Sequence, residues 1–233
     1  YGQSHKLLSN LDSTYKSGNS IIENHSHTSF FKSGKGDIQI DIENLDQQLL
    51  NAALHFSINK LRVKKNKDSL TYDPSLEFLA YNCTKFYTSS KFKGASKGRD
   101  KYERVLYMAS RSMGLKQNLI TTNVAYTDIL DVQSKKRIYK SRSRSHPGFY
   151  YMSGSKKNPA TDEKVPVCTY NQLAQKVVDL FSKNANRLIL LSSSFETSAC
   201  YLHLDTYSLR GNRPPKFKVI QILAGKRLTL QKG

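Results

Sequence analysis

The sequence predicts an α+β fold, because helical and strand patterns occupy different stretches of the chain. From Leu50 to Leu61, apolar residues recur at three- and four-residue steps, which is the period of one helical face. The last third instead holds two strand-like runs, Ser198–Leu204 and Lys216–Leu223, joined by an open turn. Two such runs in succession predict an antiparallel ribbon.

The first predicted helix covers about 46–65, and a second follows after a lysine-rich turn and a short extended piece, Leu70–Tyr72. The apolar face of the first helix comprises Leu50, Leu54, Ile58 and Leu61. Asp73 and Pro74 start the second helix, because the aspartate oxygen caps free amides and proline loses no hydrogen bond in the first turn. Its apolar face comprises Leu76, Leu79, Ala80 and Cys83.

Residues 1–44 are polar and show no sustained period, so we predict an N-terminal arm that packs on a domain or a partner. Within the arm, Asp37–Ile42 alternates polar and apolar residues, which predicts a short edge strand. The body of the protein follows at 45–233. The chain begins with Tyr1, and an export signal removed by processing is the economical explanation.

The middle of the body alternates between helix and strand patterns. Arg99–Met113 has a helical face and ends at Gly114, a residue that favours helix termination. Leu119–Leu130 is rich in Thr, Val, Ile and Tyr, which predicts a strand. Thr169 can cap a further helix, whose apolar face comprises Leu173, Val177, Leu180 and Phe181.

Charge is the most unusual bulk property. The 233 residues include 37 Lys and Arg against 18 Asp and Glu, a formal net charge of +19. Such an imbalance predicts an anionic partner and does not bear on the fold. No apolar run reaches the roughly 18–20 residues of a membrane span. Cys83, Cys168 and Cys200 are too few for a disulfide scaffold, and both a Cys168–Cys200 bridge and buried thiols remain open.

The most irregular stretch, about 131–166, is predicted to be a long basic loop or hairpin inserted into the body. Basic and aromatic residues interleave in it, which is typical of a groove that binds anions by charge and stacks rings. The predicted contact residues are Lys135, Lys136, Arg137, Lys140, Arg142, Arg144, Phe149, Tyr150, Tyr151, Lys156 and Lys157. A solvated insertion without a partner is the alternative.

A motif in the first half resembles a known family. It comprises Asn59, Arg62, Leu70, Tyr72, Asp73, Leu76, Leu79 and Ala80. Its order and spacing resemble the opening signature of the CAP superfamily (cysteine-rich secretory, antigen 5 and pathogenesis-related proteins), also called SCP-like. Asn186-Arg187 before Ile189-Leu190, and the final strand at Val219–Leu223, resemble later segments of the family in the same order. The chain is identified as a divergent bacterial member over about 46–224.

This resemblance implies a three-layer α-β-α sandwich around a small antiparallel sheet. It also implies a central cleft, which in the family usually holds two histidines and two acidic residues that can bind zinc. Here Asn186, beside Arg187, replaces a histidine, and Gln117 replaces an acid, with Asp179 as a remaining acidic candidate. An amide lacks the charge of a carboxylate, and a metal needs several deprotonated ligands. We therefore expect a degenerate cleft at Gln117, Asn186 and Arg187, without metal or cofactor.

Other polar residues are better explained by structure than by chemistry. His25 and His27 belong to the polar arm, His55 lies among packing positions of the first helix, and His146 lies in a turn before Pro147. Ser192–Ser194 with Glu196 lacks the G-x-S-x-G context of a nucleophile, so we predict a linker there. Asp162 and Glu163 are adjacent on an extended stretch and should point apart, which argues against paired acid–base catalysis.

These features predict a non-catalytic binding or accessory protein of the secreted space, periplasm or cell envelope. Its arm and basic insertion are the expected contact elements, and a subunit of an outer-membrane secretion or transport complex is the specific expectation. A protein is the first expected partner. A lipid- or anionic-glycan-binding module is one alternative, since some family members carry sterols or fatty acids, and a hydrolase with an unrecognised site is another. Nucleic-acid binding ranks below these.

Overall fold

The computed structural model describes residues 13–88, 106, 120–132, 136–205 and 214–225. Its helices, in chain order, are α2 (Ser20–Asn24), α3 (His27–Lys32), the 3-10 helix η1 (Lys35–Asp37), α4 (Gln47–Lys64), α5 (Pro74–Thr88), α7 (Tyr170–Phe181) and α8 (Asn184–Leu190). Its strands are β1 (Thr71–Tyr72), β2 (Ile120–Asp128), β3 (Ile138–Lys140), β4 (Phe149–Tyr151), β5 (Thr197–Asp205) and β6 (Lys216–Ala224).

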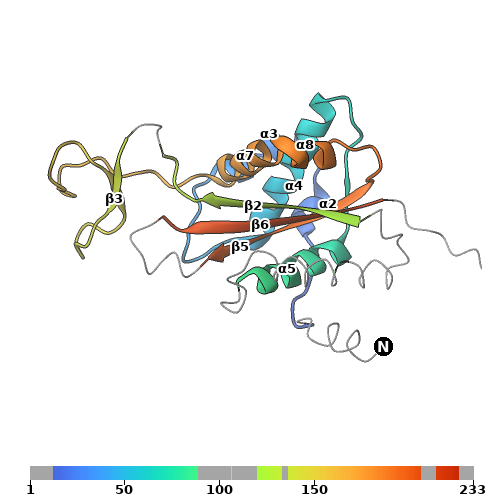
Figure 1. Cartoon of the computed structure of the whole chain (residues 1–233), viewed down its shortest axis with the longest axis horizontal. Helices are drawn as coiled ribbons and strands as arrows, with labels where there is room; N and C mark the ends of the chain where they lie inside the picture. The colour runs from blue at the N-terminus through green and yellow to red at the C-terminus, as the bar shows by residue number, and fades with distance from the viewer. Residues whose placement is uncertain (1–12, 89–105, 107–119, 133–135, 206–213, 226–233) are drawn as a thin grey trace, which may run out of the picture.

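Four strands form the main sheet in the order β1-β5-β6-β2. Figure 1 shows α5 on one face of this sheet and α4, α7 and α8 on the other, which confirms the predicted α+β class and its layers. The pairs β5–β6 and β6–β2 are antiparallel, whereas β1 runs parallel to β5. The sheet is therefore mixed rather than wholly antiparallel, because the chain leaving α4 passes beside the start of β5 before it turns into α5.

Both faces of the main sheet are covered, so every residue of β6 except Lys216 is buried. On one side, Phe217, Val219 and Leu223 pack in the core that includes α4 and α7. On the other, Ile220 and Ile222 pack in the core that includes α5. This two-residue alternation is that of a strand covered on each side.

Each of the three long helices begins at a capping residue, and two of these, Asp73 and Thr169, are the ones predicted from the sequence. Asp46 accepts a hydrogen bond from the backbone N–H of Leu49 at 2.9 Å, which starts α4. Asp73 accepts from an N–H two residues further on, also at 2.9 Å, ahead of α5. Thr169 and Gln172 form a reciprocal capping box at the start of α7.

Two polar residues anchor α4 at the centre of the molecule. Asn59 accepts from the backbone N–H of Leu70 at 2.8 Å and donates to its carbonyl at 2.9 Å. Arg62 is only 1% exposed, and its Nη1 donates to the Leu190 carbonyl at 2.6 Å. These are the Asn and Arg of the CAP-like motif, and each joins α4 to a distant segment of the chain.

The described part of the arm packs on both sides of the body. Phe30 is fully buried, and its ring lies 4.7 Å from that of Phe56 on α4. Tyr15 stacks on Tyr81 of α5, with ring centroids 4.0 Å apart. The arm is therefore an integral part of the fold over its described residues.

The prediction of an edge strand at 37–42 is wrong. This stretch makes a single isolated bridge, between Gln39 and Thr169, and lies beside the start of α7 instead of the sheet. Ile40 is buried, but Ile38 is 57% exposed, so the alternation does not mark a sheet face. The apolar residues serve to dock the end of the arm.

All three cysteines are buried free thiols, so the Cys168–Cys200 bridge does not form. Burial raises the pKa of the Cys83, Cys168 and Cys200 thiols. A buried thiol with a raised pKa is a weak nucleophile, and we assign these residues to packing.

Some predictions fall outside the described residues. The helix expected at 99–113 is described only at Leu106, which is helical and buried, and Gly114 and Gln117 are not described. The strand expected at 119–130 is β2, over 120–128. None of the described helices combines the length and the apolarity that crossing a bilayer would require.

Candidate interaction surface on the basic hairpin

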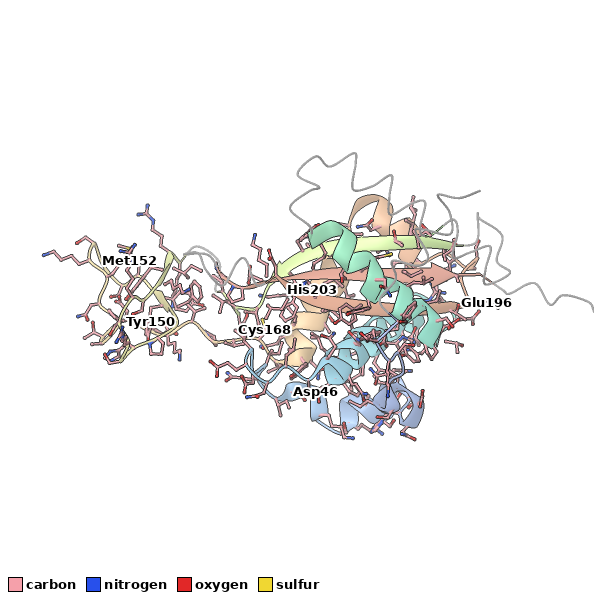
Figure 2. The ribbon with its side chains drawn as sticks, turned by 90° about the horizontal axis from the view of Figure 1, so that it is seen from below. Asp46, Tyr150, Met152, Cys168, Glu196 and His203 are labelled. Atoms are coloured by element: carbon pink, nitrogen blue, oxygen red, sulfur yellow. The ribbon has the colours of Figure 1, made fainter. Side chains whose placement is uncertain are left out.

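The basic insertion folds into a hairpin that projects from the body (Figure 1). β3 and β4 pair antiparallel, with Tyr139 opposite Tyr150, and the returning chain adds a bridge between Tyr150 and Lys164. We call residues 136–165 the basic hairpin. Figure 2 shows Tyr150 in the projecting part and Cys168 where the chain re-enters the body.

The aromatic side chains of the basic hairpin lie inside it. Tyr139, Phe149, Tyr150 and Tyr151 are only 3–9% exposed. The rings of Tyr139 and Tyr150 stack at 5.9 Å, and the Tyr151 hydroxyl donates to the carbonyl of Asp131 at 3.1 Å. The predicted stacking role of Phe149, Tyr150 and Tyr151 is therefore corrected: Tyr150 packs on Tyr139 within the hairpin, and Phe149 and Tyr151 belong to the hydrophobic cluster that continues into the body.

Asp162 fastens the loop after β4 back onto β3. Its carboxylate accepts hydrogen bonds from the Ser153 hydroxyl, from the backbone N–H of Asn158 at 2.9 Å and from the Tyr139 hydroxyl at 2.7 Å. These donors, led by Ser153, lower the pKa of Asp162 to about 2. The carboxylate is 7% exposed, so its role is structural.

The neighbouring carboxylate, Glu163, points elsewhere. It forms an ion pair with Lys136 at 3.1 Å, and both side chains are about half exposed. The Lys136 ammonium also lies 4.6 Å from the ring centroid of Tyr151. Asp162 and Glu163 thus have separate partners, and this geometry does not bring them together on one substrate.

Cationic side chains dominate the outside of the basic hairpin, which carries eight basic and two acidic residues. The exposed ones are Lys136, Arg137, Arg142, Arg144, Lys156, Lys157 and Lys164, while Lys140 is half-buried. A hollow of about 440 Å³ lies along β3. Its lining residues are Ile138, Tyr139, Lys140, Ser141, Arg142, Ser143, Lys157 and Pro159. Lys135 lies outside the described residues.

The predicted cleft residues lie far from this surface in sequence. Asn186 and Arg187 belong to α8, where Asn186 is half-buried and Arg187 is exposed. Gln117 is not described, so its distance from Asn186 is not defined. Asp179, on α7, accepts from Gln175 at 2.8 Å. Across the described ranges, no three His, Cys, Asp or Glu side chains gather in a way that could hold a metal ion.

Sequence reasoning missed a buried polar centre between the arm, β1 and α5. Glu77 is 2% exposed and accepts hydrogen bonds from the hydroxyls of Tyr15 and Tyr72, the latter at 2.5 Å. Burial raises the pKa of Glu77, against the opposing effect of these donors. Tyr72 and Glu77 are near each other in sequence, but Tyr15 is 62 residues from Glu77, and no local pattern predicts that contact.

His55 lies close to this centre and is 4% exposed. Its Nε2 accepts from the Asn59 side-chain amide at 3.1 Å, because the Asn59 oxygen is already committed to the Leu70 N–H. The hydrogen of neutral His55 is therefore on Nδ1. Burial lowers the pKa of His55 from 6.5 to about 4, so the folded protein holds it uncharged.

We expect His55 to weaken the fold in mild acid. The unfolded chain takes up a proton near pH 6.5, whereas the folded chain does so only near pH 4. The free energy of unfolding should therefore fall by about 3 kcal/mol as the pH drops through this window, and stay lowered below it. Urea unfolding of His55→Gln at a series of pH values should lack this component. The control is His146→Gln on the basic hairpin, and equal pH profiles for both variants would contradict the assignment.

Comparison with models of known protein families finds no match to this chain, and comparison with curated proteins finds none. The CAP family assignment therefore stays a prediction. It depends on the motif residues, among which Asn59 and Arg62 have the anchoring contacts described above.

Proposed function

We propose that this chain is a non-catalytic binding protein of the secreted space or cell envelope, built on a CAP-like scaffold, which holds an acidic protein partner through the basic hairpin. One observation supports it above the others: the hairpin is a braced projection with aromatic rings inside and cations outside. A surface stiffened before binding loses little conformational entropy when a partner arrives. Partner binding is then a property of the basic hairpin and not of the CAP-like scaffold that carries it.

The non-catalytic part of the proposal depends on the substituted cleft. Amide side chains at Gln117 and Asn186 replace the family's ionisable residues. The serine run before β5 is occupied structurally, since the Ser193 hydroxyl lies 3.3 Å from the Lys67 ammonium and the Ser192 hydroxyl accepts from the Ser194 N–H at 3.1 Å. These contacts favour the linker interpretation over a nucleophile.

The proposed partner is an acidic subunit of an outer-membrane secretion or transport complex. The net charge of +19 favours fast, electrostatically steered association with such a surface. This attraction must weaken as salt screens it, with a screening length of about 8 Å at physiological ionic strength.

Charge reversal on the basic hairpin tests the proposal. The variant carries Arg137→Glu, Arg142→Glu and Arg144→Glu, three exposed positions. Lys136 is left unchanged because it pairs with Glu163. We expect the melting temperature to shift by only about 2 °C, because exposed substitutions cost little, and capture of the partner in affinity purification from the envelope fraction to be lost.

The matched control reverses three exposed cations of the body: Lys64→Glu, Lys65→Glu and Lys183→Glu. It has the same net charge as the hairpin variant and should retain the partner. The proposal is wrong if the hairpin variant still captures the partner, or if both variants lose it equally.

A further inference from the structure

The hollow along β3 has the lining of a site for a negatively charged group. Three cationic residues line it, Lys140, Arg142 and Lys157, together with the hydroxyl-bearing Ser141 and Ser143. None of its described lining residues is acidic. Ser141 Oγ accepts from the N–H of Ser143 at 3.1 Å, so its own hydrogen can be donated to a bound anion.

The clamp at Asp162 holds the two sides of the hollow in place. One side is β3 and the chain after it, and the other carries Lys157 and Pro159. Asn158, between these two residues, donates its backbone N–H to Asp162 at 2.9 Å, and Tyr139 of β3 donates to the same carboxyl oxygen at 2.7 Å. The hollow is thus set by a buried network before any ligand binds.

The lining distinguishes between classes of anionic partner. A glycan held by ring stacking would need an open aromatic face, but Tyr139 has Tyr150 stacked on it at 5.9 Å and the Lys157 ammonium over its ring at 5.7 Å. A membrane would need exposed apolar anchors, and in the described ranges the exposed large hydrophobic residues lie elsewhere, at Ile38, Val63, Tyr126 and Leu188. An acidic peptide needs neither feature.

A peptide also suits the shape and the mixed chemistry of the hollow. Six consecutive residues, 138–143, run along it. An extended chain of equal length spans about 20 Å at the rise of a β-strand. Ile138 and Pro159 offer apolar contact beside the cations, and a guanidinium matches the two oxygens of a carboxylate.

We propose that this hollow receives a carboxylate side chain of an extended acidic peptide, with Arg142 and Lys157 as the binding cations. The inference rests on the proposed function, and it names the site and the partner chemistry within the basic hairpin. Arg144 and Lys156 are equally charged neighbours that do not line the hollow. They contribute only to the general attraction.

The test compares four single variants in binding a fluorescein-labelled octapeptide of alternating Glu and Leu, measured by anisotropy. At about 0.15 M salt, where long-range attraction is screened, Arg142→Ala and Lys157→Ala should each weaken binding roughly tenfold. Arg144→Ala and Lys156→Ala remove the same charge outside the hollow and should weaken it less than about threefold. A peptide with Gln in place of Glu should not bind.

The outcomes distinguish binding in the hollow from general charge attraction by the basic hairpin. Equal weakening by all four variants would overturn the hollow and leave charge attraction by the hairpin, as the proposed function requires. No weakening by any variant would overturn both. Heparin or phosphatidylglycerol vesicles that bind through Arg142 and Lys157, while the peptide does not, would assign the hollow to a glycan or a lipid and overturn the peptide inference.

Discussion

Replacing Arg62 with methionine is expected to lower the free energy of unfolding by roughly 3–5 kcal/mol. The guanidinium is 1% exposed and donates to three backbone carbonyls, those of Asp68 at 2.7 Å, Leu190 at 2.6 Å and Ser192 at 3.1 Å. Methionine fills similar space but leaves these oxygens without their donor. Urea unfolding at pH 7 measures the loss.

The control for this prediction is Lys64→Met, an exposed cation in the last turn of the same helix. It should change the free energy of unfolding by about 0.5 kcal/mol or less. Equal stabilities for the two variants would show that water replaces the guanidinium at the three carbonyls, and the anchoring role of Arg62 would be lost.

Replacing Asp162 with alanine is expected to open the basic hairpin while the body stays folded. Three donors lose their common acceptor: the Ser153 hydroxyl, the Asn158 N–H and the Tyr139 hydroxyl. Hydrogen bonds to a charged group are the stronger kind, so amide exchange in the hairpin should accelerate by on the order of 10- to 100-fold. Exchange in α4, β5 and β6 should not change.

Glu163→Ala is the matched control, because it removes a neighbouring carboxylate that serves only an exposed ion pair with Lys136. It should leave hairpin exchange almost unchanged. Comparable acceleration in both variants, or acceleration that spreads to the body, would contradict the clamp. The lowered pKa of Asp162 adds a second check: the contribution of the clamp should be present above pH 3.8 and be lost as the pH falls through about 2.

The elements that the sequence predicts best are those with local signals. Asp73 and Thr169 mark helix starts by short-range hydrogen bonds, and each does so in the structure. The ribbon of β5 and β6 also follows from local patterns, since both strands are long and each holds a run rich in apolar residues. Periodicity and capping act within a few residues, so a single sequence is enough to read them.

The errors come from contacts between distant segments. In the run Phe149–Tyr151 all three residues are buried, because Phe149 and Tyr151 pack in the hydrophobic cluster that continues into the body, while the Tyr150 ring stacks on Tyr139. Composition alone places such rings on a binding surface. Likewise, Asp37–Ile42 alternates as a strand does, but only the tertiary structure shows that, among the described strands, none pairs with this stretch, which bridges to Thr169 instead.

Of the candidate site, the sequence predicts the cations but not the Asp162 clamp. Most of the exposed cations could be identified from sequence, because lysine and arginine are rarely buried unless they are paired, and this stretch has few acids. The clamp could not, since Asp162 appears in the sequence as one of two adjacent acids and only its donors distinguish it from Glu163.

The braced hairpin has a consequence for how this protein can evolve. The partners of its carboxylate clamp all lie within one continuous stretch and its cations face outward, so exchanging these cations leaves the packing of the main body untouched. The exposed residues that determine partner choice can therefore change during evolution while the fold is kept. For the same reason, the hairpin is a segment that could be transferred to another protein by design.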